Sequence, residues 1–119
     1  MSTSTLTMVV RQLNDRASVI DVHGAITATS ESVLMNAYSD ATRASTRAVI
    51  LNMIDLEYLN SSGIGLLVTL LVRAQRQKHR LLAFGLNDHY RHIFELTRLN
   101  DAIGIYDSEQ DALAAVSVT

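Results

Sequence analysis

The chain has 119 residues, 48% of them hydrophobic and 18% charged, with a net charge of -2 and no cysteine. This composition predicts one folded domain, excludes disulfides, thiolate catalysis and zinc–thiolate sites, and disfavours direct binding to nucleic acid. The N-terminus has no signal-peptide pattern, and the longest uncharged run, 58–72, is shorter than the roughly 20 residues of a membrane-spanning helix. We therefore expect a cytoplasmic protein without membrane insertion.

The hydrophobic pattern alternates between the periods of strands and helices along the chain. Strands are expected at 8–13, 17–23, 48–53, 81–85 and 103–106. Helices are expected from Ser30 to Ala41, from Asn60 into the polar run 73–80, around 90–97 and around 112–116. Ser30 is the expected N-cap of the first helix, and Gly24 is expected to end the second strand. The second helix is apolar on nearly every face, which predicts that it is buried.

This order of elements predicts an α/β fold with a mixed, mostly parallel sheet of about four to five strands and helices packed on it. Asn14-Asp15 is the expected turn of a hairpin formed by the first two strands. In the second of these strands Asp21 and His23 alternate with apolar residues, so one of its faces is expected to meet solvent. We expect residues 1–7 to be a flexible N-terminal segment and 8–119 a single domain.

The segment NSSGIG, residues 60–65, places two serines and two glycines between an apolar strand and an apolar helix. In a structural interpretation Asn60 or Ser61 caps the helix, and the glycines allow it to pack closely on the sheet. In a functional interpretation the helix N-terminus presents an exposed serine hydroxyl, tolerates a phosphate and lets a partner approach closely. The segment matches neither a phosphate-binding Walker A loop nor a nucleophile elbow.

The run LNMIDLEYLNSSGIGLLVTLL, residues 51–71, resembles the signature of STAS domains, and in particular that of bacterial anti-sigma-factor antagonists. Asp55 matches the first acidic position of this signature, and Ser61 matches the serine that a partner kinase phosphorylates. The runs VHGAITATSESVL and IFELTRLNDAIGIYDSEQDAL resemble two further segments of the family. Two positions depart from the family pattern, because Asn60 and Thr27 stand where the family has aspartates.

The resemblance implies the STAS fold and a partner-switching regulator. Such a protein binds an anti-sigma factor of the GHKL kinase fold, which releases a sigma factor, and phosphorylation at Ser61 then dissociates the complex. A PP2C-type phosphatase would remove the phosphate. The chain would be a substrate and a ligand, with no enzymatic activity and no cofactor. The residues implied in partner binding are Thr27, Asn60, Ser61, Ser62, Gly63 and Gly65.

Two other functions are consistent with the same resemblance. STAS domains also resemble the small subunits that dock constitutively on the ATPase of lipid-transporting ABC systems, and the two missing acidic residues fit this role. The same helix N-terminus could instead accept a small anion or a nucleotide.

The sequence also contains two clusters of titratable or charged residues. His89, His92 and Glu95 are spaced three apart on a predicted helix, but a solvated surface face is the favoured interpretation, and no metal site is predicted. The cations of the run RAQRQKHR, residues 73–80, are favoured near a helix C-terminus by the helix dipole. The alternative is that they contact acidic residues of a partner.

Overall fold

The computed structural model describes residues 5–117, and residues 1–4 of the expected N-terminal segment lie outside this range. In chain order its elements are β1 (Thr7–Gln12), β2 (Ala17–Ile26), the short 3-10 turn η1 (Ala28–Ser30), α1 (Glu31–Ala41), β3 (Ala48–Leu59), α2 (Ser61–Arg76), β4 (Arg80–Phe84), α3 (Asp88–Leu96), η2 (Leu99–Asp101), β5 (Gly104–Tyr106) and α4 (Glu109–Ser117).

The five strands form one sheet in the order β1-β2-β3-β4-β5. The β1–β2 pair is antiparallel and the other three pairs are parallel, so the predicted α/β fold with a mixed, mostly parallel sheet is confirmed. In the turn between β1 and β2, Asn14 Oδ1 accepts hydrogen bonds from the amides of Arg16 and Ala17, at 2.8 and 2.9 Å. This side chain therefore fixes the predicted hairpin.

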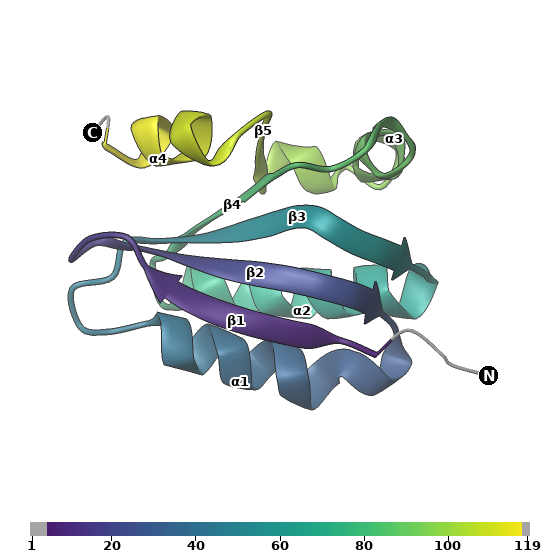
Figure 1. The fold of residues 1–119 in the computed structure, drawn as a ribbon, viewed down its shortest axis with the longest axis horizontal. Helices are drawn as coiled ribbons and strands as arrows, with labels where there is room; N and C mark the ends of the chain where they lie inside the picture. Colours follow the sequence, from purple (N-terminus) through teal and green to yellow (C-terminus); the bar gives the residue numbers. More distant parts are fainter. Residues whose placement is uncertain (1–4, 118–119) are drawn as a thin grey trace.

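Two hydrophobic cores hold the layers together. The larger core joins one face of the sheet to α1 and α2, which lie on the same side of it, and includes Tyr38, Leu67 and Phe94 (Figure 1). Phe94 and Tyr90 bring α3 into this core. The smaller core lies under α4 on the opposite face, and its buried members are Val19, Ala48, Ile50, Leu82, Phe84 and Ala112. In the described part of the chain, no helix has the length and apolar character that crossing a membrane requires.

β2 and β3 are both longer than the sequence predicted. β2 continues through Gly24 to Ile26, so the prediction that Gly24 ends the strand is wrong. Gly24 has a φ of +109°, and a Cβ at this position would lie 2.0 Å from the carbonyl oxygen of Thr5. A glycine at this position thus allows the register shift after Gly24 and the close approach of the backbone of Thr5 to β2.

Ser30 occupies the predicted N-cap position of α1, but its side chain does not cap the helix. Ser30 has a φ of -90° and a ψ of -2°, and its side chain makes no capping bond to α1. Its hydroxyl instead accepts from the amide of Thr27 at 2.9 Å and donates to the carbonyl of Ala25 at 3.3 Å. The chain therefore enters α1 through η1, one turn earlier than the hydrophobic period suggested.

The prediction that α2 is buried on nearly every face is wrong. Leu67, Leu70 and Ala74 are fully buried, but Val68 and Val72 are each 43% exposed. A helix that lies on one face of a sheet has neighbours beneath it and beside it, and no described element covers the outer face of α2. Apolar composition alone does not reveal this, because it does not say how many layers the domain has.

Candidate functional site

Of the two predicted caps of α2, Asn60 and Ser61, the structure shows that Asn60 caps the helix. It has an extended backbone, its Oδ1 accepts from the amide of Gly63 at 2.8 Å, and its carbonyl accepts from the amide of Ile64 at 2.9 Å. Amides in the first turn of a helix have no partner within the helix. The cap occupies the amide of Gly63 and leaves those of Ser61 and Ser62 facing outward.

Ser61 and Ser62 are the first two residues of α2, and both are exposed. Their hydroxyls form no hydrogen bond with any residue from 5 to 117. The first turn of α2 contains no acidic residue, because Asn60 supplies a neutral cap. A phosphate on Ser61 would meet the positive end of the helix dipole without a carboxylate in the same turn to oppose it.

The two glycines of the segment have different surroundings. Gly63 is buried, and a Cβ there would lie 2.1 Å from the carbonyl oxygen of Ile26 and 2.8 Å from Cδ1 of Leu59. A Cβ at Gly65 would have no such neighbour within 4 Å, and this residue is exposed. Gly63 therefore lets α2 pack against the end of β2, while Gly65 leaves the outer surface of the helix open.

Thr27 lies at the same end of the molecule as the serines. It directly follows Ile26, whose carbonyl lies against Gly63 of α2, and it is the N-cap residue of η1. Its hydroxyl lies 3.2 Å from that of Thr29, and it is only partly exposed. The structure thus brings together Thr27 and the segment 60–65, the residues that the sequence singled out for partner binding.

Tyr90 supports this end of the molecule, and the sequence analysis gave it no such role. β4 ends where Phe84 pairs with Asn52, so residues 53–59 of β3 extend beyond it. The hydroxyl of Tyr90, from α3, accepts from the buried amide of Leu59 at 3.1 Å. The Tyr90 hydroxyl therefore gives the amide of Leu59, one residue before the cap Asn60, a hydrogen-bond acceptor where β4 is absent. No signal near Leu59 in the sequence indicates this long-range contact.

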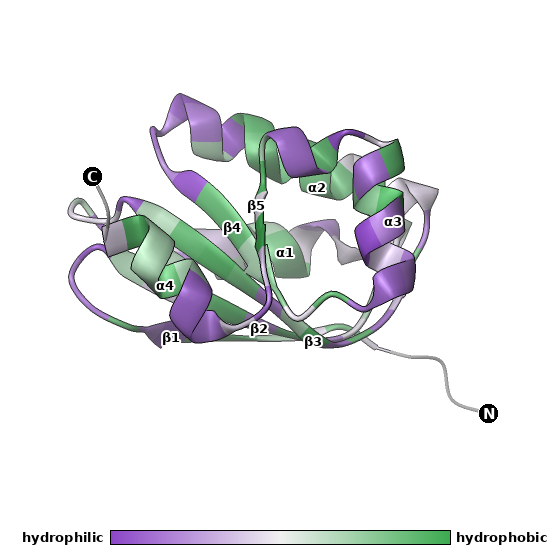
Figure 2. Cartoon of the chain, turned by 90° about the horizontal axis from the view of Figure 1, so that it is seen from above, coloured by the Kyte–Doolittle hydropathy of each residue, from purple (hydrophilic) through white to green (hydrophobic). Residues whose placement is uncertain are grey.

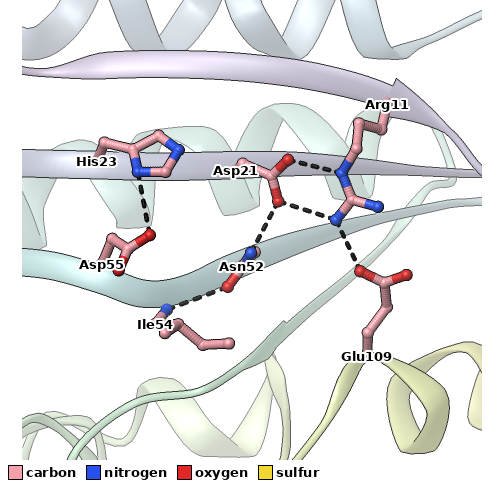
Figure 3. Close-up of polar contacts among 7 residues, drawn as sticks. All are labelled: Arg11, Asp21, His23, Asn52, Ile54, Asp55 and Glu109. Carbon is pink, nitrogen blue, oxygen red and sulfur yellow. Dashed lines mark hydrogen bonds and ion pairs between the residues drawn. The ribbon is translucent and has the colours of Figure 1, made fainter.

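The sheet face on which α4 packs carries a network of charged and amide side chains (Figure 3). Arg11 donates to both carboxylate oxygens of Asp21, at 2.6 and 2.9 Å, and to Glu109 at 2.7 Å. The side-chain amide of Asn52 donates to Asp21 at 2.7 Å. The network fastens β1, β2, β3 and α4 together, and its hydrogen bond from Arg11 lowers the pKa of Asp21.

Asp21 is expected to make the stability of the protein depend on acid pH. Because its pKa is lower in the folded state than in the unfolded chain, its contribution is complete above the unfolded value, about 3.9, and is lost as the pH falls through the folded value. The free energy of urea unfolding should fall less between pH 7 and pH 3 in Asp21→Asn than in the wild type. Asp40→Asn, on the exposed side of α1, is the control, and an equal change in both variants would contradict the prediction.

Asp55 lies on this same face of the sheet, paired with His23 (Figure 3). The Nδ1 of His23 is 3.1 Å from Oδ2 of Asp55, and the two side chains are 47% and 60% exposed. Asp21 and His23 lie on one face of β2, but the prediction that this face meets solvent holds only for His23, because the Asp21 side chain is 14% exposed. The carboxylate of Asp55 binds His23 and does not cap α2.

The histidine cluster of α3 does not form a metal site within residues 5–117. His89 packs edge-on against the ring of Tyr90, with centroids 4.9 Å apart, and His92 lies 3.7 Å from Glu95 on the exposed surface of α3. Among residues 5–117, no three His, Asp or Glu side chains converge as metal ligands would. Arg73 and Arg80 of the basic run make internal hydrogen bonds, to Ser39 and to the carbonyl of Ala115.

Comparisons with known proteins agree with this geometry. The family model of the STAS domain matches residues 8–112. An anti-sigma factor antagonist from Mycobacterium paratuberculosis has a TM-score of 0.79 at 24% identity, over 95% of both chains. The unphosphorylated form of the anti-sigma factor antagonist SpoIIAA has a TM-score of 0.75 at 18% identity, over 95% of this chain and 98% of that one.

A sulfate transporter family protein from Wolinella succinogenes has a similar fold, with a TM-score of 0.77 at 16% identity over 91% of this chain and 90% of that one. No curated protein sequence matches the chain significantly. At these identities the structural likeness establishes the fold, which proteins with different binding partners share.

Proposed function

The chain belongs to the STAS domain family, and we propose that it is an anti-sigma-factor antagonist controlled by phosphorylation at Ser61. In this proposal the unphosphorylated form binds an anti-sigma factor/serine kinase of the GHKL fold in the cytoplasm. The kinase phosphorylates Ser61 and the complex dissociates, and a PP2C-type phosphatase restores the binding form. The chain itself performs no chemistry.

One observation carries the proposal: Ser61 is an exposed serine at the first position of α2, with free amides around it and no acid in its turn. A kinase can reach such a hydroxyl, and the helix end tolerates the product. On the flanking surface, the exposed Gly65 has no side chain to keep a partner away. The likeness to two anti-sigma factor antagonists supports the same role.

The expected strength of the switch follows from the charge of the phosphate. Phosphoserine carries about -1.5 to -2 charges near neutral pH. An unpaired charge enclosed in a close interface costs several kcal/mol, and about 3 kcal/mol corresponds to a roughly hundredfold loss of affinity. Modification of a single exposed serine is therefore sufficient to exchange partners.

Affinity purification with Ser61→Ala and Ser61→Asp as parallel baits tests the proposal, with mass spectrometry as the readout. The alanine variant should retain a GHKL-type kinase from the native cell lysate, and the aspartate variant should lose it. Calorimetry with the recovered kinase should then give an affinity about a hundredfold lower for Ser61→Asp. Ser62→Asp adds the same charge one residue later, and it therefore shows whether the loss of kinase binding depends on a charge at position 61. Equal affinities for the two Ser61 variants would refute the switch.

A second candidate is a constitutive subunit that docks on the ATPase of an ABC transporter. It is favoured by the neutral residues Asn60 and Thr27 at positions where antagonists have aspartates, and by the likeness to a sulfate transporter family protein. Transporter subunits held equally by both Ser61 baits would select this function. Binding of a small anion or nucleotide would appear as a thermal shift with phosphate, ATP or GTP.

A further inference from the structure

We propose that the outer face of α2 is a docking surface for an amphipathic helix of the partner protein that carries an acidic side chain. This outer α2 surface consists of Gly65, Val68, Thr69, Val72, Arg73 and Arg76. The inference rests on the proposed function, because it assigns to the same partner a second contact that continues from Ser61 along the helix.

The apolar part of the outer α2 surface is uncovered. Val68 and Val72 are one turn apart, and each is 43% exposed. Together with Thr69, Arg73 and Arg76 they line a shallow hollow of about 430 Å³. An apolar hollow on the outside of a helix loses its contact with water only when another molecule fills it. Apolar residues four positions apart on a helix, such as Val68 and Val72, are the kind of contact that an amphipathic helix makes when it binds in an apolar groove.

The C-terminal end of α2 is hydrophilic (Figure 2), and its last turn carries two cations, Arg73 and Arg76. The α2 sequence contains no Asp or Glu. Arg73 lies 5.0 Å above the ring of Tyr38 and donates to Ser39 at 2.9 Å, so its position is fixed. Arg76 is exposed and forms no ion pair within residues 5–117. A carboxylate on the occupant, placed opposite Arg76, would neutralise the charge that α2 leaves unpaired.

The charges also argue against a second copy of this chain as the occupant. Two antiparallel α2 helices would place each Arg76 beside the positive N-terminus of the other helix. Two parallel helices would place the arginines side by side. Both arrangements are repulsive, whereas a helix with an acidic residue is attracted.

The outer α2 surface begins one turn after the phosphorylation site. Gly65 is four residues from Ser61 on the same side of the helix, and it has no side chain to hold a partner away. From Gly65 to Arg76 the helix rises about 16 Å, which is the length of three turns of a partner helix. A protein that contacts Ser61 and continues along α2 therefore reaches Arg76.

Site-specific photocrosslinking in the native cell tests this inference on the full chain. A photoreactive amino acid is placed at Ser62, at Val72 or at Val9. Val9 is the matched control, because it is a valine with 48% exposure whose neighbours in β1 pack into the core from the opposite side of the sheet. Positions 62 and 72 are expected to crosslink the same protein, and position 72 should attach to an acidic helical segment of it.

The outcomes separate this inference from the proposed function. Crosslinking at position 62 without position 72, a second copy of the chain at position 72, or equal labelling at Val9 would each overturn the docking surface. Crosslinking of one protein at both positions, with equal affinities for Ser61→Ala and Ser61→Asp, would keep the docking surface and reject the switch.

Charge reversal gives a quantitative test with the crosslinked protein. Arg76→Glu should weaken its binding by about tenfold or more, and the loss should shrink at high salt. Arg16→Glu makes the same charge change beside α4, on the other side of the sheet, and should leave the affinity unchanged. Equal effects of the two substitutions would overturn the assignment of the acidic partner.

Discussion

Gly63→Ala is expected to lower the free energy of unfolding by about 3 kcal/mol, as measured by urea denaturation. The added Cβ would lie 2.1 Å from the carbonyl oxygen of Ile26, which is backbone of β2 and cannot rotate away. Either α2 or the end of β2 has to move. The helix propensity that alanine gains over glycine, about 1 kcal/mol, does not offset this displacement.

Gly65→Ala is the matched control, because it makes the same chemical change two residues later in the same helix. Apart from its chain neighbours and the backbone of its own helix, no atom lies within 4 Å of its new Cβ, so the substitution should raise stability by up to about 1 kcal/mol. If Gly63→Ala and Gly65→Ala lowered the free energy of unfolding equally, the predicted close contact at Gly63 would be refuted. In binding experiments Gly65→Ala adds a methyl group to the outer α2 surface while the fold stays intact.

Tyr90→Phe is expected to cost about 2 kcal/mol of stability. Phenylalanine keeps the ring in the larger core but removes the oxygen that accepts from the amide of Leu59. That amide is buried, so it would lose its partner without gaining water. Tyr58→Phe is the control, because Tyr58 lies on the same strand and is 51% exposed. Similar losses in the two variants would refute the role of the Tyr90 hydroxyl.

The sequence was sufficient for features that depend on neighbours along the chain. The change of hydrophobic period located every strand and helix in the right order, and the cap of α2 followed from the short reach between Asn60 and the amide of Gly63. The resemblance to STAS domains then supplied the topology. The site residues could be named because the serines and glycines form one continuous segment.

Features that depend on distant contacts were not predictable. Gly24 reads as a strand end, because nothing near it in sequence reveals the carbonyl of Thr5 that it accommodates. Tyr90 reads as an ordinary core residue, because its hydrogen bond to Leu59 spans 31 positions. Val72 is exposed because no described element packs on the outer face of α2. The number of apolar residues in a helix does not say whether another element covers it.

The extension of β3 beyond β4 separates the end of the protein that carries Ser61 from the centre of the sheet. Residues 53–59 pair with β2 on one side only, and the register with β2 shifts between Asp21 and His23 and again after Gly24. Such a segment opens at a lower free energy than the central strands of a sheet. Under the proposed function, an enzyme that modified Ser61 and distorted the start of α2 would therefore work against this local cooperative unit alone, and the centre of the sheet would retain its fold.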